Sequence, residues 1–233
     1  MRARLFAIAA AFGLIFSGVG LSQVAHAAGE AAELPDHEWK HTGVFGTFDR
    51  DELQRGFQVF QEVCASCHSL EFIAFRNLAE IGFSEDQIKA IAAEYEVEDG
   101  PDAEGEMFMR PARASDYFPD PFDNPQAARA SNGGALPPDL SLIVKARDGG
   151  IDYLYALLTG YEEEAPEGFE LVEGMSYNHY FRGNQIAMPE PLYDEAVEYA
   201  DGTEPSLEQL AQAAPRAQPG APHDGPVFYS WRT

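Results

Sequence analysis

Cysteine is nearly absent from this chain of 233 residues, which contains only Cys64 and Cys67. Both belong to one short motif, so no cysteine is left over for a disulfide bond of the kind that staples small secreted domains. A closed zinc site takes four protein ligands, usually with a second Cys or His pair, and the sequence has no second pair of cysteines. The disulfide-rich class and the structural zinc class are therefore excluded.

Basic residues are also scarce, because 15 Lys and Arg stand against 39 Asp and Glu, a formal net charge of −24. Such a chain has no basic patch with which to hold a nucleic acid. The same charge attracts a basic protein over a distance that depends on ionic strength. We therefore expect a cationic protein partner and no nucleic acid.

Apolar runs of membrane-spanning length are absent after the first 27 residues. Within them, Arg2 and Arg4 precede the uncharged apolar run Leu5–Leu21, and Ala25-His26-Ala27 has the small-x-small pattern of a cleavage site. A retained membrane anchor is the alternative, but the run is marginal in length for a span. We expect residues 1–27 to be a cleaved export signal and the mature chain to be periplasmic, at a bacterial inner membrane.

The two cysteines belong to Cys64-Ala65-Ser66-Cys67-His68, the C-x-x-C-H signature of covalent haem attachment. Each thiol can form a thioether to one vinyl group of the porphyrin, and His68 is then placed under the iron as its proximal ligand. A thioredoxin-like redox pair also uses C-x-x-C, but it gains nothing from the histidine. We therefore predict one haem c, bound covalently through Cys64 and Cys67.

Helical periodicity leads into this motif. Leu53, Phe57, Phe60 and Cys64 recur at helical spacing and predict a helix that begins near Asp49, with Thr47 or Asp49 as its N-cap. Further helices are predicted for a short segment from Leu140 capped by Asp139, for Ile151–Thr159, for Pro191–Tyr199, and after the capping boxes Ser84-Glu85-Asp86-Gln87 and Ser206-Leu207-Glu208-Gln209.

Acidic and proline-rich segments occupy much of the remaining chain. Glu94–Glu106 contains seven acids and no base, and its glycines and proline should break any regular element. Tyr161–Gly174 is a second acidic segment, and Met107–Asn132 should be extended and irregular because of its prolines. Each acidic segment is either an ordinary solvated loop or part of a docking surface for a cationic protein. From Ala213 onward the composition turns to Ala, Pro and Gly, and we expect no packing there.

The iron's sixth ligand decides between an electron carrier and a small-molecule site. A thioether stabilises ferrous iron, and Pro189 holds Met188 extended on a stiff loop, so Met188 is favoured and His179 is second. Arg76, close to the motif in sequence, either pairs with a haem propionate or lies solvated at the surface. The full set of candidate sixth ligands is Met107, Met109, Met175, Met188, His37, His41, His179 and His223.

Further motifs are spread along the chain. They are Arg55-Gly56-Phe57-Gln58-Val59, Phe75-Arg76, Gly105-Glu106-Met107-Phe108-Met109-Arg110-Pro111, Gly134-Ala135-Leu136-Pro137-Pro138-Asp139-Leu140-Ser141, Lys145-Ala146-Arg147, Asp152-Tyr153, Leu158-Thr159-Gly160-Tyr161 and Ile186-Ala187-Met188-Pro189. With C-x-x-C-H they resemble the cytochrome c1 family, the haem subunit of ubiquinol–cytochrome c oxidoreductase, from about His37 to about Gln212.

The resemblance implies a mainly α, class I cytochrome c-like fold around one covalent haem, with an enlarged, loop-rich acidic insertion, over residues 28–212. It implies that Met188 is the sixth ligand and that Arg147 and Tyr153 approach a haem propionate, with Arg76 a weaker match. The implied activity is one-electron transfer from a Rieske iron–sulfur protein to a soluble basic cytochrome c, beside cytochrome b, without substrate chemistry on this chain alone.

Members of that family end with a transmembrane helix and basic residues, whereas residues 213–233 form an Ala/Pro/Gly-rich tail without an apolar run. A natural difference, a truncation and a frame shift are the alternatives. We expect membrane association through the other subunits of the complex. The rival functions are a free-standing periplasmic electron carrier and a haem enzyme or gas sensor with an open sixth position. A dihaem peroxidase would need a second C-x-x-C-H, which the chain does not contain.

Overall fold

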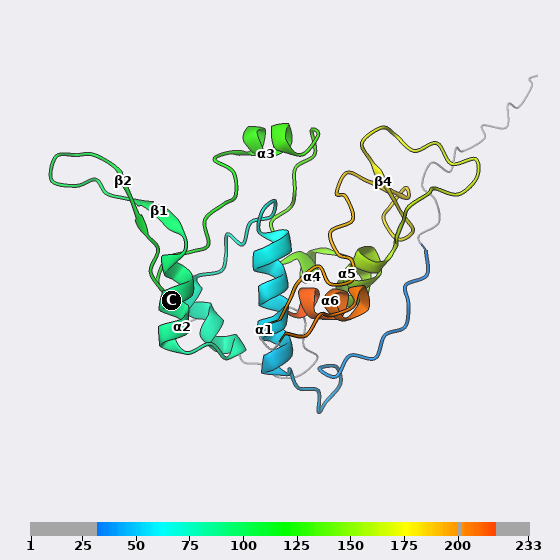
Figure 1. Ribbon diagram of the computed structural model, residues 1–233, viewed down its shortest axis with the longest axis horizontal. Coiled ribbons are helices and arrows are strands. Elements are labelled where there is room, and N and C mark those ends of the chain that lie inside the picture. Colours follow the sequence, from blue (N-terminus) through cyan, green and yellow to red (C-terminus); the bar gives the residue numbers. More distant parts are fainter. Residues whose placement is uncertain (1–31, 200–201, 218–233) are drawn as a thin grey trace, which may run out of the picture.

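Helix α1 (Arg50–Val59) lies at the centre of the molecule, between α2 on one side and α4, α5 and α6 on the other (Figure 1). The computed structural model describes residues 32–199 and 202–217, so the predicted export signal and most of the predicted tail lie outside it. The other helices are α2 (Glu85–Ala93), α3 (Pro125–Ser131), α4 (Ile143–Ala146), α5 (Gly150–Thr159) and α6 (Leu207–Ala213), with a π turn η1 (Phe60–Cys64) and 3-10 turns η2 (Phe75–Ile81) and η3 (Ala214–Ala217). The prediction of a mainly α fold is confirmed.

Strands are short and form two small antiparallel sheets. One is a hairpin of β1 (Glu96–Asp99) and β2 (Phe108–Pro111), in which Glu96 lies opposite Pro111. The other has the order β3-β4-β5, built from β3 (Tyr161–Glu162), β4 (Ser176–Asn178) and β5 (Gln185–Ile186).

The start of α1 follows from local sequence. The Asp49 carboxylate accepts hydrogen bonds from the backbone N–H groups of Asp51 and Glu52, and these two acids occupy the positive end of the helix dipole. The predicted N-cap at Asp49 is therefore confirmed. The helix continues into the π turn η1, in which the N–H of Ala65 donates to the carbonyl oxygen of Phe60 at 2.8 Å.

One face of α1 packs into a cluster that is rich in phenylalanine, which we call the aromatic cluster. Leu53, Phe57 and Phe60 of α1 and its π turn are buried there against Phe75 and Phe118. The Phe75 and Phe118 rings lie 4.1 Å apart between centroids, and Phe75 is completely buried. Burying each large apolar side chain contributes about 1.5–3 kcal/mol, so this cluster fixes the packing of α1 against η2.

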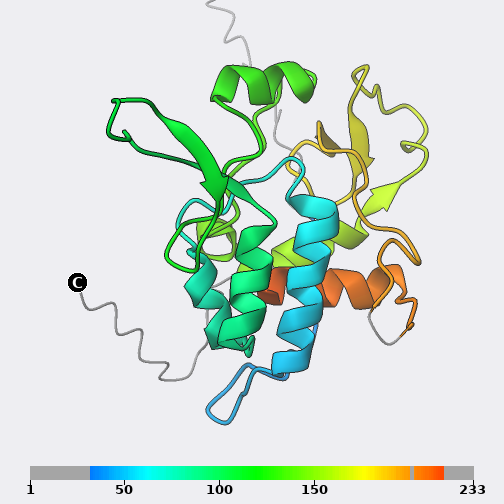
Figure 2. The ribbon, with the colours of Figure 1, turned by 60° about the vertical axis from the view of Figure 1, so that its left-hand side comes forward.

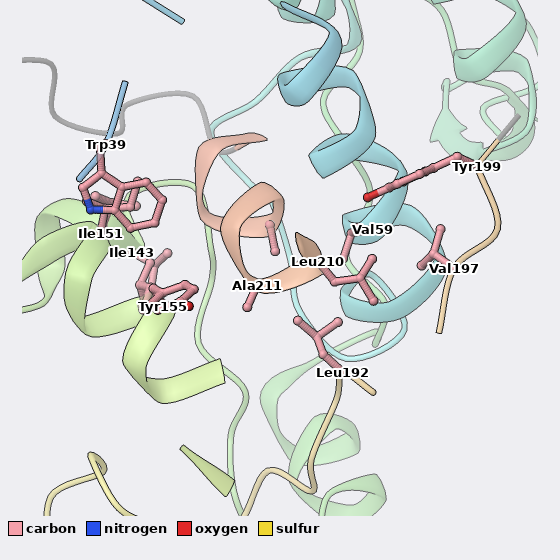
Figure 3. Close-up of a cluster of buried hydrophobic side chains, with 13 residues drawn as sticks. Trp39, Val59, Ile143, Ile151, Tyr155, Leu192, Val197, Tyr199, Leu210 and Ala211 are labelled. Carbon is pink, nitrogen blue, oxygen red and sulfur yellow. The ribbon is translucent and has the colours of Figure 1, made fainter. Parts of the chain in front are cut away.

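The opposite face of α1 contributes Val59 to a second cluster, which we call the α5–α6 cluster (Figure 3). Tyr155 of α5 and Leu210 of α6 meet there with Trp39 from the N-terminal segment. The indole N–H of Trp39 donates to the Asp152 carboxylate, which fastens that segment to α5. Because α1 is packed on both faces, the turn that follows it is held between two clusters.

Helices α2 and α6 begin at the capping boxes that the sequence predicts. Ser84 and Gln87 exchange hydrogen bonds between side chain and backbone, and Ser206 and Gln209 do the same. Both predictions are confirmed. Helix α5 ends at Thr159, as predicted, with Gly160 as its C-cap.

Three expectations about irregular segments are wrong. The acidic segment Glu94–Glu106 contributes β1, which is stabilised by pairing across the hairpin with β2. The segment Met107–Asn132, expected to be irregular, contains β2 and also α3, which Asn124 caps. Ala213, Ala214 and Pro215 are buried against the body of the protein although no packing was expected from Ala213 onward.

The helix predicted for Pro191–Tyr199 is not formed. That segment consists of turns and irregular backbone, with Glu195 at a φ of 64°, and its apolar residues Leu192 and Val197 are buried in the α5–α6 cluster. Tertiary burial therefore decides its course instead of helical periodicity. Within the described ranges, no helix has the length and apolar character that crossing a bilayer requires.

Arg110 fastens the β1–β2 hairpin to the body. Its side chain, 16% exposed, makes two hydrogen bonds to the Asp116 carboxylate, at 2.6 and 3.2 Å, and a further ion pair with Asp99 of β1. Hydrogen bonding to Arg110 lowers the pKa of Asp116 and the pKa of Asp99 below their ordinary value. A carboxyl whose pKa is depressed by folding stabilises the fold above its unfolded pKa and loses that contribution as the pH falls.

We predict that Arg110→Met lowers the free energy of unfolding at neutral pH and that the difference from wild type shrinks as the pH falls below about 4. Urea denaturation at a series of pH values measures this difference. Lys89→Met, which removes the exposed Lys89–Glu85 pair, is the control and should have little effect. A difference for Arg110→Met that stays constant with pH would contradict the role of these carboxylates.

Candidate haem site

The Cys64–His68 motif forms one compact turn at the end of α1. The N–H of Cys67 and the N–H of His68 both donate to the carbonyl oxygen of Cys64, at 3.1 and 2.9 Å. Cys64, Cys67 and His68 are all half-buried. Burial and the neighbouring Cys67 raise the pKa of Cys64 to about 12, so Cys64 is a neutral thiol here. One turn thus presents two thiols and one imidazole within a single stretch of chain.

The imidazole of His68 is oriented by a backbone carbonyl from a distant segment. Its Nδ1 lies 2.8 Å from the carbonyl oxygen of Pro138. Because a carbonyl oxygen can only accept, Nδ1 carries the hydrogen and Nε2 keeps its lone pair. Histidines that bind metals are commonly held in this way, with the other ring nitrogen donating to a carbonyl. Burial also lowers the pKa of His68, which favours the neutral, ligating form.

Asp139 joins the turn after His68 to the loop that contains Pro137 and Pro138. Its carboxylate accepts hydrogen bonds from the Ser69 hydroxyl at 2.9 Å, the Glu71 N–H at 2.8 Å and the Ser141 N–H at 2.9 Å. The N–H of Leu140 donates to the carbonyl oxygen of Ser69 as well. Asp139 was expected to cap a helix from Leu140, but α4 begins only at Ile143, with Leu142 as its N-cap.

Met188 lies directly beyond β5. It is half-buried, and its carbonyl oxygen accepts a hydrogen bond from the Tyr161 hydroxyl at 3.2 Å. The sheet that carries β5 is fixed to α5 by Asn178, which is completely buried and donates to the carbonyl oxygen of Leu157 at 2.8 Å. Sequence reasoning missed Tyr161 and Asn178 as supports of this loop, because each acts through a hydrogen bond to a residue that is remote in the sequence.

The predicted propionate residues fall into two groups. Arg147, exposed at the end of α4, is close enough to Tyr153 for its charge to lower the Tyr153 pKa, although the larger effect of burial raises that pKa. The phenol of Tyr153 in turn contributes to raising the pKa of Tyr161. Arg76 lies elsewhere, where its guanidinium donates to the carbonyl oxygen of Ser115 at 3.0 Å and faces the Tyr117 ring. Contact of Arg147, Tyr153 or Arg76 with a propionate stays a prediction.

The remaining candidate ligands have other surroundings. His37 packs between aromatic rings, 4.3 Å from Trp39 and 4.8 Å from Tyr155 between centroids. Met109 on β2 and Met107, just before that strand, are both exposed. His223 lies outside the described residues, and no cluster of three His, Cys, Asp or Glu side chains suited to a metal occurs among those that are described.

These donors fit a covalently attached haem. The thiols of Cys64 and Cys67 match the two thioether bonds, and the neutral imidazole of His68 matches a proximal ligand whose second nitrogen is anchored. Leu140 contacts both the aromatic cluster and the α5–α6 cluster, so the apolar surroundings of the motif come from both clusters.

Comparison with known proteins places these features in one family. The model of the Cytochrome C1 family matches residues 39–214. The chain is 53% identical over 178 residues to the "Cytochrome b-c1 complex catalytic subunit, mitochondrial" of Candida albicans, and the match covers 76% of this chain and 62% of that protein. It is 50% identical over 186 residues to "Cytochrome c1, heme protein, mitochondrial" of Saccharomyces cerevisiae, with 80% and 60% covered.

A bacterial relative is similar to the same degree. The chain is 48% identical over 215 residues to "Cytochrome b/c1" of Bradyrhizobium diazoefficiens, and the match covers 83% of this chain and 31% of that protein. The chain spans about three fifths of the length of the mitochondrial relatives from Candida albicans and Saccharomyces cerevisiae.

We predict that Asp139→Ala lowers the free energy of unfolding by about 2 kcal/mol, because three donors lose an ionised acceptor. Asp139→Asn, which keeps one carbonyl oxygen, should lose less. Chemical denaturation of the purified protein measures both effects. Asp36→Ala, at an exposed position, is the control and should stay within about 0.5 kcal/mol of wild type. Equal stability of Asp139→Ala and wild type would contradict the connecting role of Asp139.

Proposed function

This chain belongs to the cytochrome c1 family, and we propose that it is the electron-transfer haem subunit of a cytochrome b-c1 complex. The observation that carries the proposal is the C-x-x-C-H turn whose histidine is held through Nδ1 by Pro138, so that Nε2 is left to bind iron. The mainly α structure agrees with the class I cytochrome c-like fold of such a subunit.

Each site residue has a defined task in this proposal. Cys64 and Cys67 would hold the porphyrin through thioethers, and the His68 nitrogen and the Met188 sulfur would bind its iron. The bound iron supplies one-electron chemistry by cycling between its ferric and ferrous states. Arg147 and Tyr153, which are close enough to interact electrostatically, would hold a propionate in this proposal, with Arg76 the weaker candidate.

A stiff site suits such a role. His68 is fixed by donating through Nδ1 to the carbonyl oxygen of Pro138, and Met188 is fixed because its carbonyl oxygen accepts from the Tyr161 hydroxyl. Ligands that are fixed before an electron arrives need little rearrangement when the charge on the metal changes. The chain carries out no substrate chemistry of its own in this proposal; it receives an electron from a Rieske iron–sulfur protein and passes it to a soluble cytochrome c.

The acidic segments support docking of a basic acceptor. The connection between β1 and β2 and the connection between β3 and β4 both extend beyond the end of α1 that leads to Cys64 (Figures 1 and 2). Acids in these connections are exposed, among them Glu104, Glu106, Glu163 and Glu164. Charges of one sign on the side of the molecule that carries the C-x-x-C-H turn would steer a cationic partner toward it and raise the rate of encounter.

Assembly with cytochrome b and the Rieske protein, at the periplasmic face of a bacterial inner membrane, is part of the proposal. Arg2, Arg4, the apolar run Leu5–Leu21 and the Ala25-His26-Ala27 pattern support export with removal of a signal. The family match favours the subunit over a free-standing soluble carrier.

We predict that the ferrous protein does not bind carbon monoxide and that Met188→Ala does, since the variant opens the sixth position. Absorption spectra after addition of carbon monoxide measure this. Met175→Ala, a half-buried methionine near the same sheet, is the control and should behave as wild type. Rapid binding of carbon monoxide by the wild type would remove Met188 as a ligand, and binding by Met175→Ala alone would transfer the role.

We predict that electron transfer to a basic cytochrome c slows at least roughly tenfold as salt rises from about 50 to about 500 mM. Stopped-flow oxidation of the ferrous protein measures the rate. Neutralising Glu104, Glu106 and Glu163 to Gln should flatten the salt dependence. A control that neutralises Glu33, Asp36 and Glu38, on the N-terminal segment, should not. A flat salt response of the wild type would show that these acidic connections do not guide docking.

A further inference from the structure

We propose that Tyr161 is the positioning residue for the axial thioether: its hydroxyl holds the backbone of Met188 and so keeps the sulfur at the iron. The inference rests on the proposed function, in which Met188 is the sixth ligand. The direct observation is the hydrogen bond of 3.2 Å from the Tyr161 hydroxyl to the carbonyl oxygen of Met188. It joins residues that are 27 positions apart in the chain.

Met188 has little regular structure of its own to hold it. The strand before it, β5, contains only Gln185 and Ile186, and the segment after it forms turns in place of the predicted helix. Pro189 restricts the backbone at Met188 but does not fix its position relative to the rest of the protein. A contact from another element is therefore needed to fix the position of the Met188 backbone.

Tyr161 is itself rigidly placed. It follows Gly160, whose carbonyl oxygen accepts a hydrogen bond from the N–H of His179 at 2.8 Å. A Cβ on Gly160 would lie 2.4 Å from a ring carbon of Tyr180 and 2.7 Å from the carbonyl oxygen of Ala156, so the backbone passes through a space that only glycine fits. The backbone between α5 and β3 is therefore closely packed directly before Tyr161.

The three-stranded sheet and the Tyr161 hydrogen bond together connect the loop that carries Met188 to β3 at two points. Tyr161 of β3 pairs with Asn178 of β4, and Ser176 of β4 pairs with Ile186 of β5, which leads to Met188. The Tyr161 hydroxyl then returns from the first strand to the residue just beyond the last. Met188 is thus held from both ends of the sheet, by the covalent chain on one side and by the hydrogen bond on the other.

Asn178, whose side chain is buried completely, connects the β3-β4-β5 sheet to α5. Its amide donates to the carbonyl oxygen of Leu157 at 2.8 Å, and its oxygen accepts from the N–H groups of Tyr180 and Phe181 at 3.0 Å. The position of Tyr161 is therefore fixed relative to α5, which packs in the α5–α6 cluster with α1. Through this path the sulfur ligand and the C-x-x-C-H turn share one rigid frame.

The test uses the full-length haem-loaded protein and the variant Tyr161→Phe, which removes one oxygen atom and keeps the ring. Imidazole, added to the ferric protein, has to displace the methionine before it can bind. We expect its association rate to rise about tenfold in Tyr161→Phe, because the cost of releasing the loop falls by the strength of one buried hydrogen bond. The ferric charge-transfer band that thioether ligation produces should weaken in the same variant.

Tyr155→Phe is the matched control. Its hydroxyl donates to Glu208 at 3.2 Å, the same distance as in the Tyr161 bond, but between α5 and α6. It should alter the thermal unfolding midpoint without changing the imidazole rate or the charge-transfer band. Haem content and circular dichroism of each variant establish that it is folded, and a variant with the wild-type midpoint but a faster rate isolates positioning from stability.

Two further outcomes separate this inference from the proposed function. An unchanged rate in Tyr161→Phe, with a thioether band in the wild type, would overturn the positioning role and leave Met188 as the ligand. Equal acceleration by Tyr155→Phe would also overturn it, since general loosening would then explain the effect. A wild-type protein without the thioether band would overturn the assignment of Met188 itself.

Discussion

The hydrogen bond between His68 Nδ1 and the carbonyl oxygen of Pro138 is the constraint on which the site depends. It joins segments 70 residues apart, so the imidazole is oriented only when the segment with Pro138 is folded against the C-x-x-C-H turn. Asp139 strengthens the same connection from the next position, through the turn that follows His68. The proline pair limits the backbone freedom of the loop, and its carbonyl therefore presents a fixed acceptor to the ring.

The two apolar clusters explain why a long, loop-rich chain can hold such a site. Helix α1 is packed on one face by the aromatic cluster and on the other by the α5–α6 cluster, and the C-x-x-C-H turn leaves its end. The N-terminal segment adds Trp39 to the second cluster and is hydrogen-bonded to α5. The loops are thus carried by a frame that is fixed near the ligands and open at the surface.

Local patterns could be predicted from the sequence, and contacts between distant segments could not. The caps at Asp49, Ser84 and Ser206 involve neighbours within three positions, and each one begins the expected helix. The C-x-x-C-H turn is equally local. Pro191–Tyr199 has helical spacing but follows the buried positions of Leu192 and Val197 instead, and the β1–β2 hairpin depends on Arg110 meeting Asp116. Tyr161 was missed for the same reason, since its partner Met188 is remote in sequence.

The π turn at Phe60–Cys64 has a consequence for how this region can vary. A π turn accommodates an extra residue within a helix and so changes the phase of every side chain that follows it. Here the change sends Val63 toward the α5–α6 cluster and Cys64 toward the aromatic cluster. Deleting one residue would restore α-helical geometry but rotate both cysteines about 100° around the axis. A change in length between Phe60 and Cys64 would therefore move both cysteines away from the positions that this turn gives them.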